Sequence, residues 1–153
     1  MNYAKSGLNG SEGINTRFAS ICFLFLLLAG CGKELDYTEV ELNSVGADVQ
    51  EFIHKVRKDN GYYLFMDGED TYYLFLNGSI AESGETTIHF SDLQIDAQQD
   101  VLKLSIQESR IAEDSTEIEP KSAVLYRIQK DRSYDTLLLE VNGEETSFDG
   151  VGM

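Results

Sequence analysis

Apolar and polar residues follow three different patterns along this chain. Residues 18–28 form an 11-residue apolar run that only Ser20 interrupts. Further along, apolar side chains recur at positions i, i+3, i+4 and i+7, which places them on one stripe of a helix. From residue 61 onward, short apolar or alternating runs are separated by turn residues, as in strands. The helical stripe consists of Val49, Phe52, Ile53 and Val56.

Charged and turn residues bound the predicted helix. Asp48 or Ser44 can cap its start, and Gly61 provides a stop signal after Asn60. Basic residues crowd the last turns, where they complement the helix dipole. The pattern predicts a helix that covers one face of a sheet, with His54 beside the apolar stripe.

Two neighbouring segments repeat one pattern. Residues 62–68 and 72–78 both read Tyr-Tyr-Leu-Phe, then an apolar residue, then a turn dipeptide. Asp67 to Thr71 connects the two runs, so we expect an antiparallel hairpin. Both of its faces are apolar or aromatic, which indicates a central hairpin covered by the helix on one side.

The remaining strands predict the fold class. Asn142-Gly143 lies between two β-rich runs and is a strong hairpin signal. We expect residues 108–119 to form a polar loop closed by Pro120, and the last residues to fray. The prediction is an α+β domain, mostly antiparallel, with about seven or eight strands in a small barrel or sandwich and one helix packed on the sheet. Besides the hairpin, the apolar or alternating runs from which these strands are drawn lie near residues 37–42, 86–90, 93–95, 101–106, 123–128, 136–141 and 144–148.

The first thirty residues resemble a bacterial export signal. Lys5 and Arg17 precede the apolar run, which is too short for a membrane span of roughly 20 residues but suits a signal-peptide core of about 7–15. The run leads into Leu28-Ala29-Gly30-Cys31, a tetrad similar to the lipobox of bacterial lipoproteins. This resemblance implies cleavage between Gly30 and Cys31 and a diacylglycerol on the Cys31 sulfur.

The lipoprotein resemblance sets the expected domain organisation. It implies a removed signal peptide at 1–30, a lipidated tether at 31–36 and a single β-rich domain at 37–150. Cys22 would be removed and Cys31 blocked, so we expect no disulfide. The protein would face outward from the plasma membrane of a Gram-positive cell, or lie on the outer membrane of a Gram-negative cell, because Gly32 rather than Asp follows the cysteine.

Charge limits the classes of partner. The chain carries 12 basic and 27 acidic residues, and without residues 1–30 there remain 10 basic against 26 acidic residues, a net charge of −16. Such a surface repels phosphate backbones and anionic head groups, which excludes nucleic-acid binding. Membrane attachment must therefore come from the acyl chains on Cys31.

Acidic residues offer one candidate metal site. Asp67, Glu69 and Asp70 lie together at the hairpin tip, and Ca²⁺ binds clusters of carboxylate oxygens. The tip lacks the ligand pattern of an EF-hand loop, so a solvated turn remains the alternative. A second acidic segment carries the same two interpretations and contains Glu113, Asp114, Glu117 and Glu119.

Catalytic motifs are absent from the sequence. It contains no Gly-x-Ser-x-Gly, no Gly-rich phosphate loop and no zinc-ligand spacing. His54 and His89 are the histidines outside the predicted leader. We predict no cofactor and no catalytic residue; a cell-surface hydrolase or small-ligand carrier is the alternative, and a weak calcium-binding module a further one.

Aromatic residues are the remaining candidates for binding. Tyr62, Tyr63, Tyr72 and Tyr73 lie on the two strands of the predicted hairpin. If one face of the hairpin is uncovered, these rings form an amphipathic surface for a partner. Core packing is the alternative.

A second resemblance involves residues 47–142. The helix, Gly61-Tyr62-Tyr63-Leu64-Phe65, the following turn, the strand 101–106 and the segment from Pro120 to Ile128 are similar to the PrcB-type domain. That domain occurs in bacterial lipoproteins and is named from a subunit of a surface protease complex. The family's Thr-Gly-Gly-Tyr turn is Thr71-Tyr72-Tyr73 here, without the glycines, so no functional residue is carried over. We expect a non-catalytic surface lipoprotein that binds or stabilises another envelope protein, with the aromatic hairpin and the acidic loops as its contact surfaces.

Overall fold

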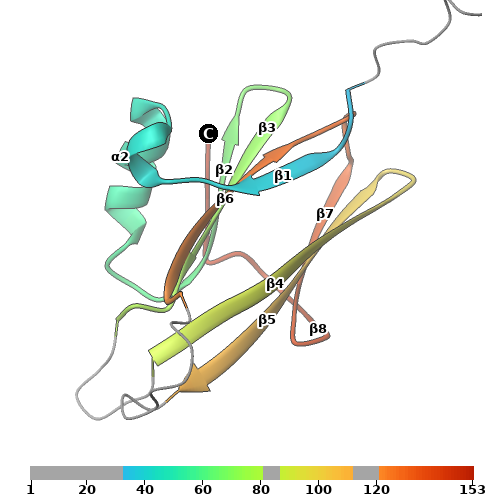
Figure 1. The fold of residues 1–153 in the computed structure, drawn as a ribbon. Coiled ribbons are helices and arrows are strands. Elements are labelled where there is room, and N and C mark those ends of the chain that lie inside the picture. Colours follow the sequence, from blue (N-terminus) through green and yellow to red (C-terminus); the bar gives the residue numbers. More distant parts are fainter. Residues whose placement is uncertain (1–32, 81–86, 112–120) are drawn as a thin grey trace, which may run out of the picture. The chain divides into compact units, whose positions relative to one another are not determined.

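Two β-sheets and one α-helix make up the part of the chain that this computed structural model describes, residues 33–80, 87–111 and 121–153 (Figure 1). Residues 33–153 form one compact unit. The expected α+β class is confirmed, and of the two predicted architectures the described residues form a sandwich-like pair of sheets rather than a closed barrel. The elements are β1 (Asp36–Glu39), η2 (Leu42–Ser44), α2 (Ala47–Val56), β2 (Gly61–Asp67), β3 (Thr71–Asn77), β4 (Thr87–Gln98), β5 (Val101–Ile111), β6 (Ala123–Gln129), β7 (Thr136–Val141), β8 (Glu144–Thr146) and β9 (Gly150–Gly152).

The sheets are mixed, with mostly antiparallel neighbours. Sheet A has the order β1-β6-β3-β2-β9 and sheet B the order β4-β5-β7-β8. Two neighbouring pairs are parallel, β2 with β9 and β5 with β7. These parallel pairs arise because the chain crosses from sheet A to sheet B between β6 and β7, and returns between β8 and β9.

The predicted hairpin is confirmed as β2 and β3. Its register runs from Gly61 opposite Asn77 to Asp67 opposite Thr71, with a turn in which Gly68 has φ 66°. This left-handed conformation suits glycine, which has no Cβ to clash with the backbone. The hairpin lies in the interior of sheet A, flanked by β6 and β9.

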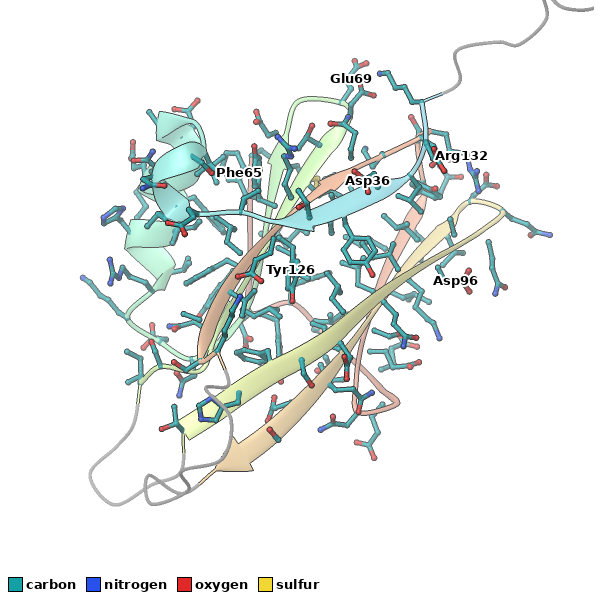
Figure 2. The ribbon with its side chains drawn as sticks, viewed as in Figure 1. Asp36, Phe65, Glu69, Asp96, Tyr126 and Arg132 are labelled. Carbon is teal, nitrogen blue, oxygen red and sulfur yellow. The ribbon has the colours of Figure 1, made fainter. Side chains whose placement is uncertain are left out.

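Sheet A lies between the helix and sheet B (Figure 1). Odd-numbered residues of β2 and β3 pack against α2, whereas even-numbered residues pack against sheet B, because successive strand residues point to opposite faces. In Figure 2, Phe65 lies on the helix side, where its ring is 5.3 Å from that of Phe52. The helix-side core contains Val45, Val49, Ile53, Tyr63, Phe65, Tyr73, Phe75 and Leu125.

The predicted helix exists, but its ends differ from the expectation. Gly46 occupies the N-cap without a side-chain hydrogen bond, so neither Ser44 nor Asp48 caps the start. The Ser44 hydroxyl instead donates to the Glu41 carbonyl within η2. The helix ends at Val56, before the predicted stop, because the chain must turn back early enough for β2 to begin at Gly61.

Three strand predictions need correction. Residues 86–90 and 93–95 belong to one strand, β4, which bulges between Ser91 and Gln94 where Asp92 has φ 51°. Strand β5 extends to Ile111 and so includes the start of the predicted loop. The last residues do not fray, because β9 pairs with β2. Within the described ranges, no helix has the length and apolarity to span a membrane.

Candidate functional site

The predicted processing and lipidation residues, Gly30 and Cys31, lie outside the described residues, as do Cys22 and the acidic residues 113–119. The hairpin tip is described. Asp70 forms an ion pair with Lys33, and its carbonyl accepts a hydrogen bond from the Lys130 N–H at 2.8 Å. Asp67 and Glu69 are exposed. In the described ranges, no group of three or more His, Cys, Asp or Glu side chains is arranged to hold a metal ion.

The four candidate tyrosines lie in or against the core. Tyr63, Tyr72 and Tyr73 are only 6–8 % exposed. Tyr62 is half-buried, and its ring packs edge-on against Phe90 with 6.2 Å between centroids. Helix α2 covers one face of the hairpin and sheet B the other, so these rings do not form an open aromatic surface. The four tyrosine rings therefore pack in the core or against it, which was the alternative to an exposed binding surface.

The two histidines lie on different layers. His54 is on the exposed side of α2, where its Nδ1 is 2.7 Å from the Gln50 carbonyl. His89 is on β4, in the sheet on the other side of sheet A. The two imidazole rings therefore do not share one site.

A cleft of about 310 Å³ lies between α2, the chain that leaves β1, and the ends of β3 and β6; we call it the helix-side cleft. Its wall is mixed: seven of the twelve lining residues are apolar, five are polar or charged, and neither histidine is among them. Small-molecule sites are mostly apolar hollows with a few polar groups, so this cleft is more polar than is usual for them. The apolar lining includes Val40, Leu42, Ile53, Phe75 and Leu125.

Asn77 makes one wall of the helix-side cleft rigid. This side chain is 1 % exposed, and all its polar atoms have partners. Its Nδ2 donates to the carbonyls of Arg57 at 3.1 Å and Asp59 at 2.8 Å, while its Oδ1 accepts from the Ser79 hydroxyl at 2.7 Å. The amide thus fixes the end of α2 against the end of β3. From the sequence, Asn77-Gly78 indicated only a turn.

The backbone of β6 is partly unpaired where it borders the cleft. The Gly78 N–H donates to the Ser122 carbonyl, so even-numbered residues of this segment direct their backbone groups towards β3. The Val40 N–H donates to the Leu125 carbonyl at 2.9 Å, so odd-numbered residues point towards β1. Ala123 belongs to the odd set, but β1 pairs only with residues 126–129. No described strand pairs with Ala123 on this side.

Three charged side chains line the cleft, Glu39, Glu41 and Arg57, and Glu39 is paired with a lysine outside the lining. The Lys121 ammonium donates to both carboxylate oxygens of Glu39, at 2.5 and 2.7 Å. Glu41 and Arg57 line the cleft and are exposed, and within the described ranges neither forms an ion pair. The opening therefore carries one available charge of each sign.

A second, smaller hollow of about 190 Å³ lies at the junction of the two sheets. The Tyr62 hydroxyl donates to Glu108, whose side chain is only 11 % exposed and lies 3.7 Å from the Arg110 guanidinium. Burial, and then the Glu108 carboxylate, raise the pKa of Tyr62. Asp149 accepts from the Tyr62 N–H at 2.8 Å. Because these groups are already paired with one another, they stabilise the junction rather than offer open ligand positions.

Sequence reasoning did not identify the helix-side cleft. The Arg57 and Asn77 side chains and the Ala123 backbone border this cleft. They are far apart in the chain and match no motif. These residues border one cleft because β1 ends at Glu39, and the end of β1 could not be predicted from the sequence. Comparison with known proteins adds no assignment, since no family model, curated protein or solved structure matches this chain.

Proposed function

We propose that this protein is a lipid-anchored domain of a bacterial envelope that binds another envelope protein, and that the helix-side cleft is the contact. The observation that carries the proposal is a hollow with apolar side chains on part of its wall, beside the backbone of Ala123, which no described strand pairs on this side. Both features favour association with a partner, because apolar side chains gain from burial and unpaired backbone groups gain from a hydrogen-bond partner.

The anchor in this proposal is the lipid on Cys31. A net charge of −16 after residue 30 opposes electrostatic binding to anionic bilayers, so attachment depends on acyl chains, each buried CH₂ contributing about 0.8 kcal/mol. We expect that the Cys31→Ala protein keeps its signal peptide uncleaved and carries no lipid. Membrane fractionation with radiolabelled palmitate tests this. A Cys31→Ala protein that is still processed and membrane-bound would refute the anchor, and Cys22→Ala serves as the matched control.

The resemblance of residues 47–142 to the PrcB-type domain does not assign the partner. The turn at Thr71-Tyr72-Tyr73 lacks the family's glycines, so neither a binding role nor a site residue is transferred from that family.

Site-specific photo-cross-linking in intact cells tests the contact. A photoreactive residue at Leu42 lies in the cleft wall, whereas one at Asp96 lies on the open side of sheet B. We expect a discrete adduct from position 42 that position 96 does not give. A folded, anchored protein without an adduct at position 42, or with the same adduct at both positions, would contradict the proposal.

A further inference from the structure

We infer that Asn142 is a site of spontaneous deamidation in the folded protein, where its carboxamide is converted to aspartate or isoaspartate. The site lies in the turn between β7 and β8, and the inference is independent of the proposed function. Three features support it: the Asn-Gly sequence of the turn, the exposure of the Gly143 backbone, and the weak anchoring of β8.

The chemistry of deamidation explains why an Asn-Gly pair is susceptible. The backbone nitrogen of the glycine loses its proton and attacks the asparagine Cγ, and the bond from Cγ to Nδ2 breaks. The leaving NH₂ group takes up a proton and departs as ammonia, which leaves a five-membered succinimide ring. Water then opens this ring at either carbonyl and gives aspartate or isoaspartate. Glycine has no Cβ to obstruct the attack, and asparagine is among the thermolabile residues.

Three Asn-Gly pairs lie in the described residues, and they begin at Asn60, Asn77 and Asn142. Their local chemistry is the same, so the fold decides which pair reacts. The pair at Asn77 is closed, because the Asn77 side chain is 1 % exposed and the Gly78 N–H donates to the Ser122 carbonyl at 2.6 Å. The attacking nitrogen is therefore already bonded in the interior of the protein.

The pair at Asn60 is held by its surroundings. The Asn60 Nδ2 donates to the Ile80 carbonyl at 2.7 Å, and its Oδ1 accepts from the Ile80 N–H at 2.9 Å. Gly61 begins β2 in the interior of sheet A, and a Cβ there would lie 2.5 Å from an Asp149 carboxylate oxygen. The Gly61 backbone cannot approach the Asn60 carboxamide unless β2 moves.

The pair at Asn142 is open to solvent. Asn142 and Gly143 form the two-residue turn between β7 and β8, with φ values of 53° and 85° that are typical of a type I′ hairpin. Both residues are exposed, and no atom lies within 4 Å of the position that a Gly143 Cβ would take. Among the described residues, no backbone carbonyl accepts a hydrogen bond from the Gly143 N–H. The attacking nitrogen is therefore accessible to water and base.

One contact must open before Asn142 reacts. Its Oδ1 accepts from the Glu108 N–H at 2.8 Å, and its Nδ2 donates to the Glu108 carbonyl at 3.1 Å. This opening is local, because β8 has three residues, all exposed, at the edge of sheet B. Such segments open at a much lower free energy than the whole domain unfolds. Release of Asn77, in contrast, requires the buried end of β3 to open.

The reaction weakens the end of sheet B. A carboxylate in place of the Asn142 carboxamide cannot donate to the Glu108 carbonyl, and it adds one negative charge next to a strand that contains Glu144 and Glu145. Isoaspartate also inserts a methylene group into the main chain of a two-residue turn. We therefore expect the deamidated protein to unfold at a lower urea concentration than the original.

Peptide mapping by mass spectrometry tests the inference on the full chain, purified from membranes in detergent and incubated at pH 8.5 and 37 °C. An isoaspartate-specific methyltransferase identifies the isoaspartate product. We expect deamidation at Asn142 to be about tenfold faster, or more, than at Asn60 and Asn77. In concentrated urea we expect the three rates to converge, because only the shared Asn-Gly chemistry remains. The chain thus contains its own matched controls.

Two results would overturn the inference. The first is a folded protein in which Asn142 reacts no faster than Asn60 or Asn77. The second is an Asn142 that reacts in urea but not in the folded protein, because the Glu108 contact would then close the site completely.

Asn142→Asp reproduces one product without the reaction and tests its consequence. We expect this variant to have a lower urea midpoint than the wild type. An unchanged midpoint would show that the Asn142 carboxamide does not hold the end of sheet B, and would overturn this part of the inference.

Discussion

The two sheets differ in how they are covered, and the difference separates structural positions from accessible ones. In sheet A the central strand β3 is buried at every residue from Tyr72 to Asn77, because α2 lies on one face and sheet B on the other. In sheet B the strand β5 alternates: Leu102, Leu104 and Ile106 are buried, whereas the residues between them are partly exposed.

This difference in cover explains why the rings of the aromatic hairpin are buried and why the cleft is open. A strand that is covered on both faces requires apolar side chains at successive positions. The run Tyr72-Tyr73-Leu74-Phe75 meets this requirement, and all four side chains are buried. The cover of sheet A is incomplete where β1 ends at Glu39 and the chain departs towards α2. The helix-side cleft lies at this point.

The largest expected effect concerns the two faces of β3. Leu74 points to sheet B and Phe75 to α2, and both are buried. We expect Leu74→Ala and Phe75→Ala each to lower the free energy of unfolding by about 3–4 kcal/mol, through lost burial and a residual cavity. Urea denaturation measures both. A cost below about 1 kcal/mol for Phe75→Ala alone would mean that α2 does not cover sheet A as described.

The next largest expected effect concerns Gly78, which directly follows β3 of sheet A and contacts Ile88 in β4 of sheet B. Its N–H donates to the Ser122 carbonyl, and its carbonyl accepts from the Ile88 N–H at 3.3 Å. A Cβ at this position would lie 2.6 Å from the Ile88 Cβ, so Gly78→Ala forces backbone movement. We expect a loss of about 2–3 kcal/mol, measured as a lower midpoint in urea.

Gly46→Ala is the control for this substitution. A Cβ there has no neighbouring atom within 4 Å, and Gly46 has φ −61°, which any residue adopts. We expect a change of less than about 1 kcal/mol from the altered N-cap. Equal costs at both positions would show that close approach of the two sheets is not what requires Gly78.

Local apolar patterns predicted most of the helix and strands, but they could not predict which strands pair with one another. The stripe of Val49, Ile53 and Val56 predicted α2, because the helix buries that stripe against sheet A. The alternation at Leu102, Leu104 and Ile106 predicted β5 for the same reason. These patterns report burial of a face, which the sequence carries locally.

The end of the chain shows why other features were missed. Gly150-Val151-Gly152 has no apolar period, so it read as a fraying terminus. It forms β9 because Gly152 allows close packing of Phe52 and Phe65, against which any Cβ would lie within 3 Å. Glu108 read as a solvent loop residue for a similar reason, since its burial depends on Tyr62, 46 positions away in the sequence. The direction of the Ala123 backbone groups likewise depends on the register between β3 and β6, which the sequence does not show locally.

A smaller effect concerns the junction of the sheets and depends on pH. Burial and the Glu108 carboxylate raise the pKa of Tyr62, and burial and Asp131 raise that of Tyr134 to about 12. An unfolded tyrosine ionises near pH 10. Because the folded state favours the neutral phenols, their stabilisation is present below pH 10 and is lost as the pH rises through the folded pKa values.

Thermal melts between pH 8 and 11.5 check this expectation. We expect the melting temperature to fall above pH 10 and the fall to be smaller in Tyr62→Phe, which cannot ionise. At pH 8 we expect Tyr62→Phe to cost about 1 kcal/mol, because Glu108 loses a hydrogen bond but keeps its contact with Arg110. An unchanged alkaline slope in Tyr62→Phe would remove the junction as its source.

The smallest expected effect lies on the open face of sheet B, and it completes the comparison. Lys103 pairs with Glu140 at 3.3 Å, and the Ser105 hydroxyl lies 3.4 Å from the same carboxylate. Both residues are partly exposed, and such pairs contribute little because water screens them. We expect Ser105→Ala and Lys103→Ala each to change the free energy of unfolding by less than about 0.5 kcal/mol, although Leu104 between them is as buried as Leu74. A cost above 1 kcal/mol at either position would show that this face is covered in the folded protein, and that sheet B resembles sheet A more closely than its alternation indicates.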